Sequence, residues 1–212
     1  LSLYGSNGTD GAATQIGFRP DGSGAVSGAI NIFLKGGGLT LQGGNAAGAY
    51  TQIGHGGTGA ASTTINAPVT ISFCEAGDVA LTAGNGLGAY AHIGHGGNAW
   101  NGDRAGDIRL EGMGELSLTS GATNAYTQIG HAGPSHQGSA SGDLAISPLG
   151  ALVLAGDGNN AYAQIGHRAL GSLVPEASGP VAVDSGGGLA LYGGAGVQSS
   201  AQIGHGGVNA AP

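Results

Sequence analysis

Five histidines end successive copies of one short phrase, and neutral imidazole is a common metal ligand in proteins. The full phrase reads Ala-Tyr-Thr-Gln-Ile-Gly-His, but its first copy has Phe18 where the later copies have histidine. The phrase holds no Asp, Glu or Cys co-ligand, and identical ligands on stacked strands form a line, whereas zinc prefers a tetrahedral shell. We therefore predict hydrogen-bonded structural histidines, with no metal and no cofactor. The row comprises His55, His95, His131, His167 and His205.

Other positions of the phrase also form rows. Alternation with period two is the strand period, so Ile129 is predicted to point inward with Thr127 and His131. Tyr126 and Gln128 then point outward. Stacked glutamines would form amide ladders and stacked tyrosines aromatic ladders; the alternative is an exposed aromatic and polar stripe that binds a glycan or another fibre. The rows are Ile16, Ile53, Ile93, Ile129, Ile165 and Ile203; Gln15, Gln52, Gln128, Gln164 and Gln202, with His92 in the third copy; and Tyr50, Tyr90, Tyr126 and Tyr162.

The interval between copies is nearly constant. The isoleucines are 37, 40, 36, 36 and 38 residues apart, which is typical of units that bury their apolar faces against one another. Each unit also holds two alternating pieces, such as Ile108-Arg109-Leu110 and Leu116-Ser117-Leu118, separated by glycine-rich turns. We predict an all-β parallel β-solenoid of about six 36–40-residue repeats. Each repeat has three short strands, and residues 1–212 form one solenoid segment.

The number of coils per repeat has two solutions. One repeat forms either a single large coil or two coils of about 18–20 residues. In the second solution the Ser/Gly-rich stretch Pro134–Gly142 is a weak strand. The stretch after each histidine varies in length, as in Gly56–Pro68, which indicates a loop and favours the single coil. An antiparallel sandwich is the other all-β alternative, but its strands are not equivalent by stacking.

Composition excludes several classes of protein. The chain has 48 glycines and only 8% charged residues, yet 40% of its residues are hydrophobic, which is unlike a disordered chain. Five scattered basic residues and a net charge of −7 give no footprint for nucleic acid. No apolar run approaches the length of a membrane span. Cys74 follows the apolar run Val69–Phe73 and is predicted to be a small buried hydrophobe.

Catalytic signals are missing from the repeat. No pair of carboxylates recurs at one level of the stack, whereas acid–base catalysis needs such groups gathered in one place. We therefore predict that the protein is not an enzyme. One loop combines an aromatic ring with charges, since Trp100 lies close to Asp103, Arg104 and Asp107. Trp100 is the candidate for surface binding, by stacking on a sugar ring.

The repeat style resembles a known family. The Leu-X-Leu-X-Gly-Gly and Ala-Tyr-X-Gln-Ile-Gly-His-Gly-Gly units, which cover essentially all 212 residues, resemble the repeat tracts of filamentous-haemagglutinin-like bacterial exoproteins. These include two-partner-secreted and autotransported adhesins. The resemblance implies a right-handed parallel β-helix, export to the bacterial cell surface or medium, and an adhesive or scaffold role. The repeat is longer than the coil of about 20 residues usual in that family.

Three functions follow as hypotheses. The first is a structural or adhesive extracellular filament, in which the segment is part of a longer repeat protein or fibre. Its partners would be other repeats, copies of itself end to end, and glycans on host or neighbouring cells, with no nucleic acid and no membrane span. The second is a β-helix carbohydrate-active enzyme or carbohydrate-binding module. The third is an ice-binding solenoid, which needs flat threonine arrays on an outer face.

Overall fold

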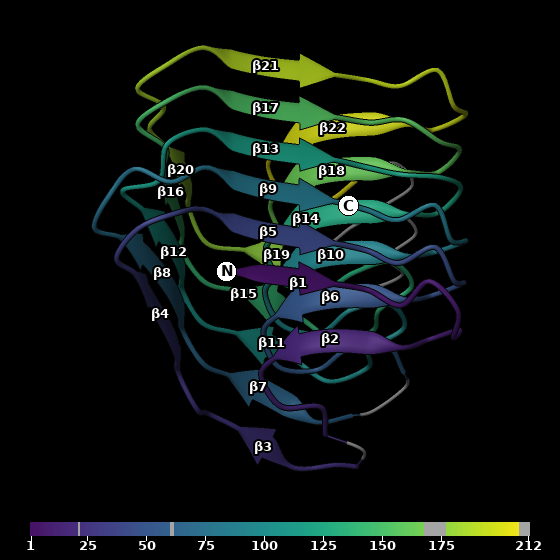
Figure 1. The fold of residues 1–212 in the computed structure, drawn as a ribbon. Coiled ribbons are helices and arrows are strands. Elements are labelled where there is room, and N and C mark those ends of the chain that lie inside the picture. Colours follow the sequence, from purple (N-terminus) through teal and green to yellow (C-terminus); the bar gives the residue numbers. More distant parts are fainter. Residues whose placement is uncertain (21, 60–61, 168–176, 208–212) are drawn as a thin grey trace.

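The chain folds as a parallel β-solenoid. The computed structural model describes residues 1–20, 22–59, 62–167 and 177–207. Within these residues every regular element is a strand, and strands of equivalent position in successive repeats pair in parallel (Figure 1). No helix in this part of the chain has the length and hydrophobicity to cross a membrane. The predicted fold class is confirmed.

Four stacks of strands form the walls of the solenoid, which we name sheets A to D in the order in which the chain first reaches them (Figure 1). Sheet A contains β1 (Ser2–Tyr4), β5 (Leu39–Gln42), β9 (Val79–Thr82), β13 (Leu116–Thr119), β17 (Leu152–Ala155) and β21 (Leu189–Tyr192). Sheet B contains β2 (Ala13–Ile16), β6 (Tyr50–Ile53), β10 (Tyr90–Ile93), β14 (Tyr126–Ile129), β18 (Tyr162–Ile165) and β22 (Ser200–Ile203).

The other two sheets have one strand fewer within the described residues. Sheet C contains β3 (Ala25–Val26), β7 (Thr64–Asn66), β11 (Arg104–Ala105), β15 (Ala140–Ser141) and β19 (Ala177–Ser178). Sheet D contains β4 (Ile30–Leu34), β8 (Val69–Phe73), β12 (Ile108–Glu111), β16 (Leu144–Ser147) and β20 (Val181–Val183). The described strands thus form five coils, numbered from the N-terminus, and half of a sixth.

The register shows that one repeat is one large coil. Tyr126 pairs with Tyr90, 36 residues earlier, and Ala91 pairs with Thr51, 40 residues earlier. The expectation of three strands per repeat was incomplete, because each full coil has a fourth strand in sheet C. That strand is only two or three residues long, too short to show alternation in the sequence. In the fourth coil it is β15, which lies within the Ser/Gly-rich stretch but belongs to the same coil.

The main core lies between sheets A, B and D. Their inward residues alternate with outward ones along each strand, as Leu41, Ile53 and Ile71 illustrate in the second coil, and all three are fully buried. Burial of each such side chain stabilises the fold by roughly 1.5–3 kcal/mol. A second, smaller cluster lines sheet C and contains Ile65, Ala67 and Trp100. The apolar alternation in the sequence therefore corresponds to one continuous core along the stack.

Glycine in the repeated phrase is required by the stacking itself. Gly130 has a φ of 149°, in a region that side-chain-bearing residues rarely adopt. A Cβ atom at this position would overlap the carbonyl oxygen of Gly166 in the next coil. Gly94 and Gly166 have the same relation to the coils that follow them. This corner therefore excludes every other residue type.

Cys74 differs from its prediction. The thiol is free and its side chain is exposed, because Cys74 follows the inward-pointing Phe73 at the end of β8 and alternation turns it to the outside. The neighbouring apolar run was a poor guide, since its inward members are Val69, Ile71 and Phe73 only.

Candidate functional site

The histidine row is a ladder of directed hydrogen bonds. The backbone N–H of each position donates to the Nδ1 atom of the histidine in the next coil, over 2.9–3.1 Å at all five steps from Phe18 to His205. Each Nε2 lies 2.6–2.9 Å from a backbone carbonyl oxygen at the corner that precedes sheet D. Because Nδ1 accepts, Nε2 must carry the proton and donate. The neutral Nε2–H tautomer is therefore fixed throughout the row.

Burial keeps the inner histidines uncharged. Removal from water lowers the pKa of His95 to about 3 and that of His167 to about 4, although each Nε2–H bond to a carbonyl opposes the shift. Burial also lowers the pKa of His131 well below its usual value, and the neighbouring His95 and His167 add to this effect. The rings stack with centroids 4.8–5.2 Å apart. Neutral stacked rings avoid the repulsion that a line of imidazolium ions would suffer.

This geometry leaves the row without a free ligand atom. Both ring nitrogens of each ladder histidine already have a backbone partner. Across the described ranges, no group of three or more His, Cys, Asp or Glu side chains is placed to hold a metal ion. Phe18 in the first copy of the phrase suggested that packing in this row tolerates an apolar ring. Phe18 lies on the outermost coil and is 56% exposed, so it does not show that an apolar ring is tolerated inside the ladder.

The glutamine row binds backbone rather than neighbouring glutamines. Gln52 Nε2 donates to the carbonyl oxygens of Gly94 and Gly96 in the next coil, at 2.9 and 2.7 Å. Gln15, Gln128 and Gln164 make equivalent bonds. Within the described coils no glutamine amide bonds another, so the expected amide ladder was wrong. The glycine corner of the following coil offers two carbonyl groups within reach, and these take the amide protons instead.

His92 replaces glutamine in the third coil and makes an equivalent bond to the next coil. Its Nε2 lies 2.6 Å from the carbonyl oxygen of Gly130, the corner that glutamine reaches elsewhere. Burial lowers the pKa of His92 to about 4. The ring contacts Tyr90 and Tyr126 edge-on, so the tyrosine and glutamine rows pack together. The substitution preserves the contact between coils while changing the side chain that makes it.

The tyrosine row is stacked and buried. Successive ring centroids from Tyr50 to Tyr162 are 4.5, 4.7 and 4.9 Å apart, with interplanar angles of 8–12°. The four rings are 0–4% exposed. The segments after His95 and His131 fold back over the rings, since Gly97 and Gly133 lie directly against the hydroxyls of Tyr90 and Tyr126. The outward face of sheet B is therefore covered, and these rows cannot form the exposed stripe considered from the sequence.

Trp100 was wrongly assigned to the surface. Its side chain is 1% exposed, packs on Ile65 and Ala67, and donates from Nε1 to the carbonyl oxygen of Thr63 at 3.2 Å. Arg104 is also buried and donates to the carbonyl of Gly138 at 3.2 Å. Asp103 is exposed and accepts hydrogen bonds from Ser139. The charges near Trp100 suggested an exposed loop, but the ring and the guanidinium both fill the space against sheet C.

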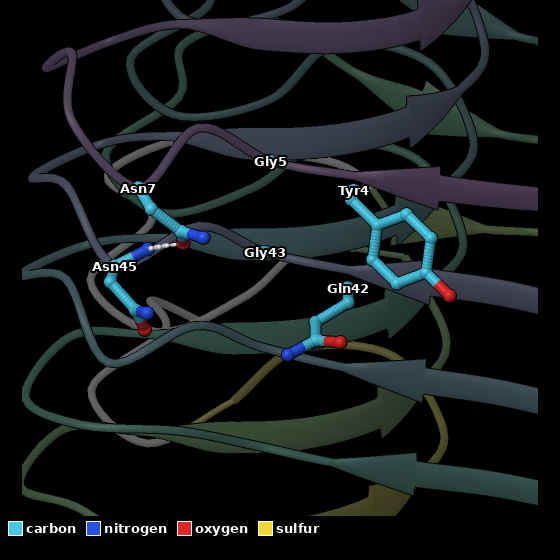
Figure 2. A pocket seen from close by; sticks show the side chains of 6 residues that line it. All are labelled: Tyr4, Gly5, Asn7, Gln42, Gly43 and Asn45. Carbon is cyan, nitrogen blue, oxygen red and sulfur yellow. Dashed lines mark hydrogen bonds between the residues drawn. The ribbon is translucent and has the colours of Figure 1, made fainter.

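A small hollow on the outside of sheet A was not anticipated from the sequence. It has a volume of about 180 Å³ and is lined by Tyr4, Gly5, Asn7, Gln42, Gly43 and Asn45 (Figure 2). Tyr4 and Gln42 are paired in register on β1 and β5, with both side chains pointing outward. Outward positions of the Leu-X-Leu-X pattern were the available signal, since Tyr4 and Tyr192 are the large side chains among them.

Comparisons with known proteins give no relative of this chain. No protein-family model matches it, and neither a curated protein nor a solved structure matches it significantly. The buried ladders and the outer hollow are therefore the features from which a role can be inferred.

Proposed function

We propose that this protein is a structural element, a rigid solenoid scaffold of an extracellular or cell-surface filament. The observation that supports this role is the interlock between coils. At inner junctions, strand pairing is supplemented by a histidine bond, a glutamine bond and a tyrosine stack, as between coils two and three. The histidine and glutamine side chains bind the protein's own backbone, and the buried tyrosines stack on one another, so all three rows hold the coils together.

The interlock resists both separation and sliding of the coils. A shift of one strand by one residue would reverse which side chains enter the core and would also break every ladder bond. In a repeat protein, stability is approximately the sum of unit and junction terms. Strong junctions therefore make a stack that behaves as one body, as a stalk or fibre requires.

The proposed partners are further coils of the same kind, either in the same polypeptide or in copies joined end to end. The outermost described coils support this, since they expose Phe18 at one end of the stack and the inward-row residues Leu189 and Leu191 at the other. Exposed strand edges are templates for further pairing. Repeated head-to-tail contacts do not close and so produce filaments. The location at the bacterial surface rests on the resemblance in repeat style, and no catalytic role is proposed.

Sedimentation velocity and negative-stain microscopy of the full 212-residue chain over a range of concentrations test this proposal. We expect association that increases with concentration and produces rods of constant width. The double variant Phe18→Lys, Leu191→Lys places charges on both end faces and should prevent association. Thr119→Lys, on the exposed lateral face of β13, is the matched control and should associate like the parent. A chain that stays monomeric, with the amides of β1 and β21 protected from hydrogen exchange, contradicts the proposal.

A further inference from the structure

The hollow over the first two coils has the composition of a recognition site for an uncharged ligand. Its side chains are one aromatic ring and three carboxamides, from Tyr4, Asn7, Gln42 and Asn45. None of its lining residues is charged. Tyr4 is 59% exposed, so the ring presents its apolar body to solvent. Each carboxamide offers donors and an acceptor, and a ligand rich in hydroxyl groups needs both.

The floor of the hollow is rigid backbone. Gly5 and Gly43 form it, and their N–H groups donate to Gln42 and Thr82 over 2.8 Å. A Cβ at Gly5 would overlap the backbone of Gly44, and one at Gly43 would overlap that of Gly84. The glycines are thus fixed by coil stacking and leave a bare floor beside the ring (Figure 2). Pre-formed geometry reduces the entropy lost on binding.

The rim is also held in place. Asn7 Oδ1 accepts the backbone N–H of Asn45 at 3.2 Å, the bond drawn in Figure 2. This bond uses the side-chain oxygen of Asn7 and leaves its NH₂ group for a ligand. The Asn45 side chain is exposed, and both its oxygen and its NH₂ group remain available. On the opposite side, Gln42 lies beside Tyr4 along the stack. A ligand in the hollow would therefore meet an aromatic face on one side and carboxamides on the other.

We propose that this hollow binds a neutral carbohydrate. The ring of Tyr4 stacks on the apolar face of one sugar, and Gln42, Asn7 and Asn45 bind its hydroxyl groups. Aromatic rings with a polar tip suit such amphipathic partners. The next coil continues both rims with Thr82 and Asn85, so an extended oligosaccharide would lie along the stack. This site goes beyond the scaffold role, which stands or falls independently of it.

A second hollow on sheet D is a poorer candidate. It has a volume of about 130 Å³ and carries the charges of Asp107, Arg109 and Asp143. The Asp107 carboxylate already accepts the backbone N–H of Asp143 at 3.0 Å. No aromatic ring is among its lining residues. A neutral sugar is therefore expected at the Tyr4 hollow and not at this one.

Binding is tested with a panel of neutral hexasaccharides (maltohexaose, cellohexaose, mannohexaose, xylohexaose and chitohexaose) and with a sulfated heparin hexasaccharide. Saturation-transfer NMR on the full chain identifies binders, and titration calorimetry gives their affinity. We expect at least one neutral member to bind saturably and the sulfated one not to bind. Tyr4→Ala should weaken binding at least tenfold, and Gln42→Ala severalfold. Tyr4→Phe keeps the ring and should retain most of the affinity.

Tyr192→Ala is the matched control. Tyr192 occupies the same outward row and is 60% exposed, but the equivalent corner beside it holds Gly193, Gly194 and Ala195 and no carboxamide. This variant should bind as the parent does. Circular dichroism and melting temperature verify that each variant is folded. The inference is overturned if no neutral hexasaccharide binds, if only the sulfated one binds, or if folded Tyr4→Ala and Gln42→Ala variants bind like Tyr192→Ala.

Discussion

Sheets A and B carry the same alternating sequence pattern but have different surroundings. In β13 of sheet A the inward residues are buried while the outward ones, Ser117 and Thr119, are partly or fully exposed. In sheet B all four residues of β14, from Tyr126 to Ile129, are buried. At β10 and β14 the difference arises from the segments after His95 and His131, which cover the second face of sheet B. A period-two pattern thus identifies a strand without showing whether one face or both are buried.

Acid should cause the largest loss of stability, and this loss should come from the sheet B side, because the buried ladder histidines follow the sheet B strands. Their folded-state pKa values are depressed, so below about pH 6.5 the unfolded chain binds protons that the folded chain does not. The free energy of unfolding should fall as the pH drops from about 6.5 towards 4, by up to about 1.4 kcal/mol per pH unit for each buried histidine. Urea titrations between pH 7.5 and 4.5 measure it. A stability independent of pH in this window would contradict the neutral ladder.

Ile129→Asn should produce the largest loss among single substitutions. The side chain is fully buried in the main core, so the change removes apolar burial and places an amide among aliphatic groups. We expect a loss of about 4 kcal/mol in the free energy of unfolding. Thr119→Asn on the outer face of sheet A is the comparison and should change it by less than about 0.5 kcal/mol. Urea denaturation at pH 7.5 measures both, and similar losses in the two variants would invert the assignment of faces.

His131→Phe should also be strongly destabilising, even though Phe18 occupies the equivalent position of the first coil. The change leaves the backbone N–H of His95 and the carbonyl of Gly106 without partners in a buried site. Each unsatisfied group costs about 1–3 kcal/mol. Thermal melting of the variant should show a clear decrease in Tm. His205→Phe on the outermost coil is the control and should cost less, so equal decreases would argue against the ladder as the cause.

Thr127→Val should have the smallest effect and the opposite sign. Within the described residues, the hydroxyl of Thr127 is buried without a hydrogen-bond partner, and Ala91 and Ala163 occupy the same row in neighbouring coils. Replacing the hydroxyl by a methyl group should raise the free energy of unfolding by about 1 kcal/mol. Thr119→Val, at an exposed position, should leave it nearly unchanged. A destabilised Thr127→Val variant would indicate a partner for the hydroxyl in solution.

The repeat and its inward rows could be predicted because they recur. Ile129 pairs with Ile93 of the preceding coil, and Leu118 pairs with Leu81. Because the same residue type recurs at each of these positions, a single sequence is enough to recognise the row. What covers sheet B could not be predicted, because the covering segment changes length and composition from coil to coil. Trp100 illustrates this, since it occurs once and no repeated pattern indicates its surroundings. Apart from the weak strand considered within Pro134–Gly142, the strands of sheet C were not predicted, because two or three residues cannot display a period.

The sequence predicted the stacked tyrosines and the hydrogen-bonded histidines but not what the glutamines would bind. Tyrosine and histidine stack because identical rings recur at the strand spacing. Gln52 instead donates to Gly94 and Gly96, a contact that depends on the φ > 0 glycine corner of a later coil. A glutamine row by itself does not reveal that corner. The hollow beside Tyr4 was missed for a similar reason, since its floor is shaped by the next coil.

Two sets of bonds along sheet B, the backbone N–H bonds to histidine Nδ1 and the glutamine amide bonds, have the same direction between coils. The backbone N–H of the earlier coil donates to Nδ1 of the later coil, and the glutamine amide of the earlier coil donates to carbonyl oxygens of the later coil. A nascent or emerging chain that folds from its N-terminus therefore carries donors on its newest coil, which the following coil satisfies on arrival. A coil added before the first would instead meet Phe18, which has no acceptor. The two ends of the described stack are thus not equivalent, since the first coil lacks the Nδ1 acceptor that the later coils present.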